Sequence, residues 1–419
     1  MSTSAIMLEQ SRDETSLTGL ARITGFFFAF RVFLVVVAVK ILQQDSDVGV
    51  GLSLGINLFL LGLVLFCAAG SARRTIGSIL RLPCNRWVLL FLGFSGASLL
   101  WTVAVSLPAA AAFWCALCAD VGIVVLLLRA GDIQEVSTGL MKGYVWGACC
   151  VAFLAWCFPA QTDLRLGIED LLGANQIGYA CGFAIFIAQY LILTREKESR
   201  WKFCAVFLAI TMLRSLSKTT IVACLAGEAF LLIWGRAFSR RAKIMVLVIT
   251  LVVIAAGWGL IEAYAEVYAT AGNQAETLSG RLGIWVIMLG EAVEKPWFGH
   301  GFHSVWKVLP PYGPDQFEIR HAHNEVLQQF YAYGVAGVLM MGALYSSFYR
   351  HVKRMDKSPV RSLLLALLLF VLVRGFADTE AFDLSLPLWA IVLFSPMLAQ
   401  VSRFQTKLNQ GEILSSDGA

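Results

Sequence analysis

The sequence predicts an all-α polytopic membrane protein with about 12 transmembrane helices. Of its 419 residues, 58% are hydrophobic and only 15% are charged, whereas soluble proteins average about 45–50% and about 25%. The mean hydropathy is +0.72. Apolar runs recur along the chain at close to the roughly 20 residues that a helix needs to cross a bilayer. An ordinary soluble domain is therefore excluded.

Twelve apolar runs define the expected spans. They cover residues 22–42, 50–70, 87–107, 109–128, 140–158, 174–194, 201–213, 218–235, 243–263, 324–348, 360–374 and 382–402. The run after Lys202 is short and ends at the polar stretch RSLSK. We expect three parts: an N-terminal bundle of about nine helices (1–263), a long loop (264–323), and C-terminal helices with a tail (324–419).

Basic residues set the expected orientation. Alternate loops carry SARRTIGSILRLPCNR, TREKESRWK, GRAFSRRAK and YRHVKRMDKSPVR. Because cytoplasmic loops are enriched in Lys and Arg, both termini should be cytoplasmic, together with Arg73, Arg240 and Lys353. The N-terminal tail mixes acidic and basic residues and should not be a cleaved signal peptide. The 264–323 loop, which lies between the ninth and tenth expected helices, should then be periplasmic.

That long loop is the main candidate for function, because long structured loops are usually functional. It contains RLGIWVIMLGEAVEKPWFGHGFHSVW, in which Pro296 should end a helix lying near the membrane interface. The apolar side of this helix should comprise Leu282, Trp285, Ile287, Met288 and Val293. The alternative is a helix that merely covers the bundle.

Few cations remain on the expected outer side, and these are candidates for binding an anion. They are Arg165, Arg214, Lys218, Arg281, Lys295, Lys307, Arg320 and Arg374. Arg214 and Lys218 are four residues apart, so a helix would place both on one face. Charges at a membrane edge mark functional sites by default, although snorkelling to the interface is the alternative for each.

Four of the five histidines lie in the same loop: His300, His303, His321 and His323. Together H-x-x-H and H-x-H could supply zinc ligands. No cysteine accompanies them, and the spacing matches no common zinc site. We therefore expect no metal and no other cofactor.

His323 differs from the other histidines because of the residues that follow it. With Asn324, Gly334 and Gly337 it forms the pattern H-N-x9-G-x-x-G at the start of an apolar run. A helix N-terminus favours an anion, and a neutral imidazole there could accept a proton. The glycines should let this helix pack closely against a neighbour. His321 lies two residues earlier and has no comparable support.

Two stretches resemble a known family. SGRLGIWVIMLGEAVEKPWFGHGF and HAHNEVLQQFYAYGVAGVLMMGALY resemble the signature region of the O-antigen ligase/polymerase superfamily (Wzy_C domain). This superfamily includes O-antigen ligases, Wzy-type polymerases and ExoQ-like exopolysaccharide proteins of the bacterial inner membrane. The resemblance is detailed over about residues 215–345 and elsewhere concerns topology only.

The resemblance implies a GT-C-like glycosyltransferase. Such proteins transfer a glycan from undecaprenyl diphosphate to an acceptor hydroxyl, with neither nucleotide sugar nor essential metal. Arg281 matches the family's loop arginine, and His323 matches its catalytic histidine. Lys218 stands where ligases usually have arginine, which keeps the charge but loses the bidentate fork and resembles the ExoQ-like branch.

The expected chemistry agrees with these positions. A lipid diphosphate gains negative charge as it leaves, so cations at Arg281, Lys218 and Arg214 would stabilise the transition state. A general base at His323 would contribute about 10²- to 10⁴-fold. The tryptophans Trp285, Trp297 and Trp306 could stack on sugar rings, as could Tyr312, although interface anchoring is the commoner role of such aromatics.

Three functions remain open at this point. The first is a polymerase of undecaprenyl-diphosphate-linked repeats, acting on donor and acceptor glycans among membrane lipids, with a chain-length regulator protein as a further partner and no nucleic acid. The second is a ligase that transfers the glycan to lipid A core. A transporter or flippase is third, since no half-and-half repeat or broken-helix pair is evident.

Overall fold

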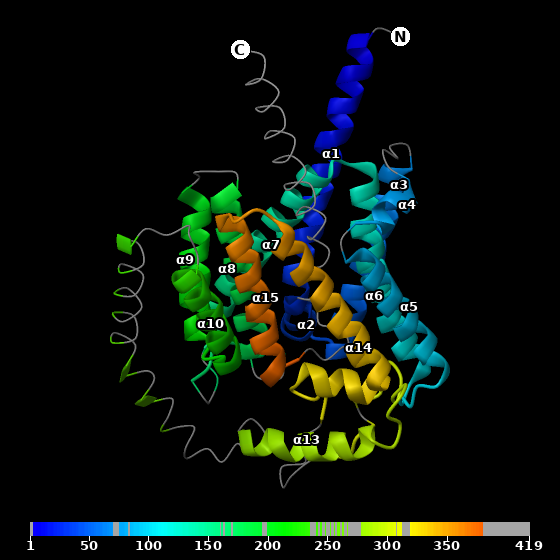
Figure 1. Cartoon of the computed structure of the whole chain (residues 1–419), viewed down its shortest axis with the longest axis vertical. Coiled ribbons are helices and arrows are strands. Elements are labelled where there is room, and N and C mark those ends of the chain that lie inside the picture. The colour runs from blue at the N-terminus through cyan, green and yellow to red at the C-terminus, as the bar shows by residue number, and fades with distance from the viewer. Residues whose placement is uncertain are drawn as a thin grey trace.

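A computed structural model describes residues 3–69, 75–82, 84–159, 161, 164–168, 171–194, 199–234, 278–306, 308–311 and 319–379, with single residues between 240 and 266. Within these residues the regular elements are helices, apart from one isolated bridge between Ile168 and Leu172. Figure 1 shows most of them as an upright bundle, with α13 lying across one end.

The helices follow the chain in two groups. The first comprises α1 (Thr3–Phe30), η1 (Arg31–Phe33), α2 (Leu34–Val36), the π-helix η2 (Val37–Ile41), α3 (Ser46–Ala68), α4 (Ile76–Leu80), α5 (Asn85–Ala97), η3 (Ser98–Leu100), α6 (Leu107–Ala130) and α7 (Ile133–Trp156). The second comprises α8 (Ala174–Thr194), α9 (Ser199–Arg214), α10 (Lys218–Trp234), α13 (Leu278–Ala292), α14 (Glu325–Arg354) and α15 (Pro359–Ala377).

Six described helices are long and apolar enough to cross a membrane. They cover Ser16–Ile41, Ser46–Ala68, Leu107–Ala130, Ile133–Trp156, Ala174–Thr194 and Pro359–Ala377. The protein is thus a polytopic helical membrane protein. Ten of the twelve expected runs coincide with a described helix, whereas 382–402 and most of 243–263 lie outside the described residues.

Close backbone packing joins α1 to α7. Gly139, Gly143 and Gly147 recur every fourth residue of α7, and a Cβ on Gly143 would overlap the carbonyl oxygen of Arg22 in α1. Small residues at this spacing let membrane helices approach closely. Asp132 caps α7 by accepting the Gln134 and Glu135 N–H groups, which satisfies two donors that a helix start leaves open.

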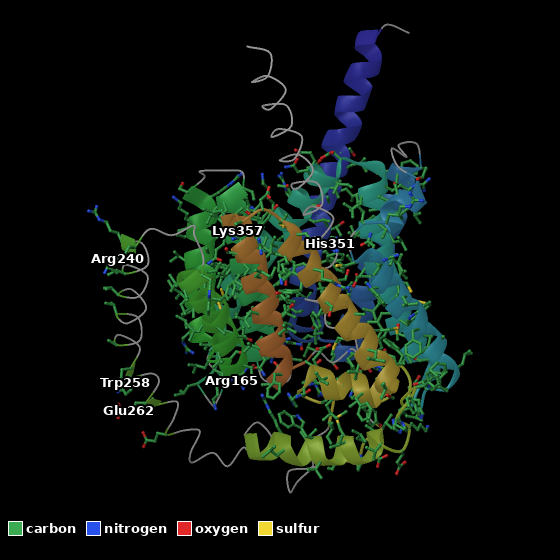
Figure 2. The ribbon with its side chains drawn as sticks, viewed as in Figure 1. Arg165, Arg240, Trp258, Glu262, His351 and Lys357 are labelled. Carbon is green, nitrogen blue, oxygen red and sulfur yellow. The ribbon has the colours of Figure 1, made fainter. Side chains whose placement is uncertain are left out.

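The two ends of the bundle carry different charged residues. Figure 2 shows Arg165 near the end covered by α13, and His351 and Lys357 at the opposite end. Since α14 runs between these ends (Figure 1), its last-turn residue Lys353 lies far from its start. Lys353 thus lies at the end of the bundle away from His323, while the side of the membrane that each end faces stays a prediction and Arg73 lies outside the described residues.

Of the two glycines predicted to let this helix pack closely against a neighbour, Gly334 does so, and its neighbour is the segment from Pro296 to Phe298. Gly334 breaks α14 with φ 63° and ψ −158°, a conformation that favours glycine. Directly after the break, the Val335 N–H donates to the carbonyl oxygen of Pro296 over 2.7 Å. A Cβ on Gly337 would overlap the Tyr333 side chain of the preceding turn. Gly334 therefore permits a kink that brings α14 against the segment after α13, whereas the close contact of Gly337 is with the preceding turn.

The expected apolar side of α13 mixed residues from two faces. Met288 is fully buried, whereas Leu282 is 50% and Val293 is 59% exposed. The buried face packs in a small apolar cluster made of Ile284, Met288, Ala292, Val305, Leu309, Ile319, Ala322 and Tyr331. The helix thus covers the end of the bundle with one apolar face and exposes another.

Candidate functional site

The site begins where α14 starts and α15 ends. The Asn324 side chain accepts the Leu327 N–H over 3.0 Å, and its amide donates to the Phe376 carbonyl over 2.9 Å. The first contact is an N-cap, which confirms the predicted helix start after His323. The second contact fixes that start against the last turn of α15.

His323 faces a carboxylate that follows α15. Its Nδ1 lies 3.5 Å from Oδ1 of Asp378, and Arg374 Nη2 lies 3.4 Å from Oδ2 of the same residue. Burial alone would raise the pKa of Asp378, but Arg374 and His323 outweigh burial and hold that pKa below its usual range. Asp378 is therefore an ionised group beside the His323 ring.

His321 is part of the same cluster, contrary to the prediction that it had no comparable support. The ring centroids of His321 and His323 are 4.1 Å apart, and the His323 N–H donates to His321 Nδ1 over 3.3 Å. Burial, followed by the effect of His323, lowers the pKa of His321 to about 3. His321 is thus a neutral ring that supports its neighbour.

The backbone of His323 is itself unusual, with φ at 50°. Residues other than glycine rarely adopt this left-handed region, and such residues gather at functional sites. In this conformation the chain turns sharply between the His321 ring and the Asn324 cap. The turn brings both imidazoles to the end of α15.

Residues of α13 cover this junction. Arg281 donates through Nη1 to the carbonyl of Ala377, the last residue of α15, and Trp285 donates through Nε1 to the carbonyl of Ala322 over 2.8 Å. A cation is favourable at a helix C-terminus. Arg281 Nε is buried without a hydrogen-bond partner. Arg281 is thus anchored by Nη1 at the end of α15, next to Asp378 in the chain.

A second group of cations lies where α8, α9 and α10 meet. Arg214 donates to the Leu164 carbonyl over 2.7 Å. Asn175 Oδ1 accepts from Arg165 and from Ser217, each over 2.9 Å. Arg165 is buried and Arg214 is half-buried. Figure 2 shows Arg165 at the end of the bundle that α13 covers.

Arg214 and Lys218 do not share one helix, because the chain breaks between the expected runs 201–213 and 218–235. Arg214 ends α9 and Lys218 begins α10, and between them Leu216 has φ 55°. The Ser215 hydroxyl donates to the Met212 carbonyl and accepts the Ser217 N–H, so side-chain contacts replace helical ones. Lys218 is exposed at this break.

Helix α8 connects the two groups. Arg374 Cζ lies 4.1 Å from the centroid of the Tyr179 ring, which is a cation–π distance. Next to Tyr179 in α8, a Cβ on Gly178 would lie 2.7 Å from Ser217 Cβ. The His323 cluster and the Ser217 turn therefore lie on either side of the first turns of α8.

The other two loop histidines are elsewhere. The His300 ring stacks on Tyr331 with centroids 4.5 Å apart, whereas the His303 ring packs on Phe113 at 4.9 Å. Among the described residues, the one group with metal-ligand geometry is His321, His323 and Asp378, whose ligand atoms lie within 4.8 Å of one another. The neighbouring Arg374 and Arg281 oppose a cation at this position.

The three candidate tryptophans have separate surroundings. Trp285 lies at the site through its contact with Ala322. Trp297 is 69% exposed, and Trp306 packs edge-on against His303 with centroids 5.7 Å apart. Lys307 and Tyr312 lie outside the described residues. Only Trp285 is thus placed beside His323.

Sequence reasoning missed Asp378, Glu325 and Thr379. Glu325 is 5% exposed, and its Oε2 accepts the Thr379 hydroxyl over 2.8 Å. Gln329 donates to Oε1 of the same carboxylate over 3.2 Å. The available signals were an acid directly after Asn324 and the charged stretch RGFAD at the end of an apolar run. These contacts fasten the segment that carries Asp378.

Fold and site together define a helical membrane protein with a histidine–carboxylate–arginine site at one end of its bundle. Comparison with known proteins agrees: the family model described as O-antigen ligase matches residues 203–342. This match confirms the family resemblance. The segment contains Arg214, Lys218, Arg281, His321, His323, Asn324, Gly334 and Gly337, while Arg374 and Asp378 lie beyond it.

A curated relative shows the same similarity. A Pseudomonas aeruginosa protein described as O-antigen ligase is 28% identical over 166 residues. The aligned part is 40% of this chain and 38% of the relative. The similarity thus spans well under half of either protein.

Proposed function

We propose that this protein is a glycosyltransferase that moves a glycan from an undecaprenyl-diphosphate carrier to a sugar hydroxyl, at the periplasmic face of the bacterial inner membrane. The observation that carries the proposal is the position of His323 beside His321 and Asp378, with Arg281 bound to Ala377, the residue before Asp378. This arrangement offers a base beside a cation. Both are needed when a hydroxyl displaces a diphosphate.

In the proposed reaction the acceptor oxygen attacks the anomeric carbon of the donor. Its proton passes to Nε2 of His323, while the bond from the anomeric carbon to the diphosphate oxygen breaks. The lipid diphosphate leaves with the electron pair. Asp378 faces Nδ1 of His323 at 3.5 Å, so a proton on Nδ1 would leave Nε2 free to act as the base.

Arg281 is the proposed partner of the departing diphosphate. Its Nη1 is held by the end of α15, and its buried Nε has no hydrogen-bond partner. A fixed cation stabilises charge that develops only in the transition state. Lys218 and Arg214, at the break between α9 and α10, are proposed as further cations for the diphosphate, and Trp285 is the proposed sugar-stacking residue.

We propose polymerisation of lipid-linked repeats as the first candidate reaction, because Lys218 replaces the arginine typical of ligases. Ligation to lipid A core is the second candidate, and the description of the Pseudomonas aeruginosa relative favours it. Both use the same donor and the same bond-breaking step. They differ only in the acceptor, which is either a second lipid-linked glycan or a core sugar.

Lipid-linked products of a deletion strain test this choice. Accumulation of single lipid-linked repeats would support the polymerase. Long lipid-linked chains that are not attached to lipid A would support the ligase instead. Unchanged lipid-linked glycans and unchanged surface polysaccharide would contradict both. The matched control is complementation with the wild-type gene and with the His323→Ala variant.

A further inference from the structure

Helix α13 and Val293, the residue that follows it, expose an apolar stripe. Leu282, Val286, Leu289 and Val293 are 50%, 72%, 50% and 59% exposed. Their spacing of four, three and four residues places them on one face of the helix. None of the four side chains contributes to the small apolar cluster under α13. Exposed apolar side chains gathered on one face mark an interaction surface.

The remaining two faces of α13 have different character. Ile284, Met288 and Ala292 are fully buried and hold the helix on the bundle, with Arg281 and Trp285 beside them. Glu291 and Glu294 are exposed on a third face. At about 100° per residue, the centre of the stripe lies roughly 120° around the helix from the buried face, and Glu291 lies next to the buried face on the other side. A helix with three such faces contacts protein, an apolar phase and water at the same time.

The apolar surface continues past the end of α13. Trp297 and Phe298 are 69% and 60% exposed, and the Phe298 ring lies 6.4 Å from the Trp101 ring. Trp101 also donates to the Phe298 carbonyl over 3.3 Å. Leu100, at 89% exposure, extends the surface at the turn between α5 and α6. The surface therefore joins α13 to helices of the bundle itself.

We propose that this apolar surface rests in the interfacial layer of the bilayer, so that α13 lies on the membrane and not in the aqueous periplasm. Six helices of the same bundle are long and apolar enough to cross a bilayer, and α13 crosses the bundle end in Figure 1. Tryptophan is enriched at membrane interfaces. Helices with one apolar and one charged face lie in that layer. The acidic face then meets water.

This placement has a consequence that rests on the proposed function. Arg281 and Trp285 project from the side of α13 that contacts the ends of α15 and the Ala322 segment. With α13 at the interface, Arg281 is held at the level of lipid headgroups. A lipid-linked diphosphate would reach Arg281 by lateral movement in the bilayer, without leaving the membrane.

Depth measurement tests the surface without any turnover. Full-length protein carrying one spin label, at Val286→Cys or Leu289→Cys in a background without native cysteines, is placed in vesicles of phosphatidylethanolamine and phosphatidylglycerol. We expect strong collisional relaxation by oxygen and weak relaxation by a water-soluble nickel chelate. The matched control Glu291→Cys, on the same helix, should show the opposite order.

Three outcomes would overturn the proposal. Nickel relaxation at position 286 equal to that at 291 would place the stripe in water. Protection from both reagents with spin–spin broadening would assign the face to a second copy of the chain. Protection from both without broadening would mean that the chain itself covers the stripe.

Kinetics separate this inference from the proposed function. In vesicles, Val286→Glu together with Leu289→Glu should raise the KM for the lipid-linked donor about tenfold with little change in kcat, while Glu291→Gln leaves both unchanged. An unaltered KM would contradict membrane delivery. If the wild type shows no transfer at all, the proposed function fails, whereas the depth measurement still decides where α13 lies.

Discussion

Oδ1 of Asp378 lies 3.5 Å from Nδ1 of His323, and Oδ2 of the same carboxylate lies 3.4 Å from Arg374 Nη2. Along the chain, α14 and α15 separate His323 from Asp378, whereas Arg374 is four residues before Asp378. The carboxylate therefore joins a loop histidine to an arginine of a membrane span. A histidine oriented in this way presents its other nitrogen to a substrate.

Asp378→Asn should lower the transfer rate by roughly 10²-fold. The amide keeps the size of the side chain but loses the charge that orients and supports the His323 ring. The measurement is the initial rate of glycan transfer from lipid-linked donor in proteoliposomes. Thr379→Val is the matched control, because it removes the hydroxyl contact to Glu325 and keeps Asp378. Wild-type turnover in Asp378→Asn would exclude the carboxylate from the mechanism.

His321 should make the folded protein less stable as pH falls. Its folded pKa of about 3 lies below the unfolded value near 6.5, so the unfolded chain binds more protons between these values and stability declines with acidification. His321→Gln cannot titrate, and its Tm in detergent should fall less than that of the wild type between pH 7 and 5. Burial also lowers the pKa values of His300 and His303, so the variant should keep part of the dependence of Tm on pH. An identical slope in both proteins would contradict the buried neutral ring.

Substitutions between arginine and lysine at positions 281 and 218 should separate the effect of side-chain charge from the effect of side-chain shape. Arg281→Lys should impair transfer severely, because one ammonium cannot both reach the Ala377 carbonyl and grip a diphosphate as a planar fork does. Lys218→Arg should be tolerated, since the exposed start of α10 supplies mainly a point charge. Steady-state kinetics with lipid-linked donor measure both effects. Undiminished turnover in Arg281→Ala would remove Arg281 from the site.

Topology is testable by cysteine accessibility. We expect labels at positions 281 and 323 to react with a reagent restricted to the periplasm, and labels at 73, 240 and 353 to react only after the inner membrane is opened. The two ends of α14 are the matched pair, because His323 precedes its start and Lys353 lies in its last turn. A cytoplasmic position 323 would separate the site from a donor presented in the outer leaflet.

Local signals predicted the start of α14 correctly and failed where distant segments meet. Asn324 caps the helix through a contact three residues away, which is readable from the sequence pattern alone. The Asp378–His323 pair depends on how α15 packs against α14, so no local pattern contains it. The expected runs 201–213 and 218–235 left a break between Arg214 and Lys218, as the structure has it, but the left-handed Leu216 and the serine contacts that form this break were not predicted.

The two glycines of α14 predicted part of the local structure correctly. Gly334 and Gly337 marked a place of close approach, and close approach is what the structure has. Yet the approaching partner is the Pro296 carbonyl at a kink and not a second helix. A spacing of three residues is compatible with either arrangement. Deciding between them requires the position of the segment after α13.

The two site histidines should respond differently to substitution. His323→Ala should abolish transfer while the amount of protein in the membrane stays normal, because His323 is the proposed base. His321→Ala should cause a smaller but clear loss, since the His321 ring packs on His323 and accepts its N–H. His300→Ala and His303→Ala are controls for general damage to the loop, because their rings contact Tyr331 and Phe113 instead.

A metal mechanism makes a different forecast for the same residues. His321, His323 and Asp378 could together bind a divalent ion, and then His321→Ala should be as damaging as His323→Ala and EDTA should inhibit the purified enzyme. We expect EDTA to have no effect, because Arg374 and Arg281 make the site unfavourable for a cation. In vitro transfer with and without EDTA, followed by zinc addition, measures this. Activity that EDTA removes and zinc restores would replace the general base with a metal, and full activity of His323→Ala would exclude both mechanisms.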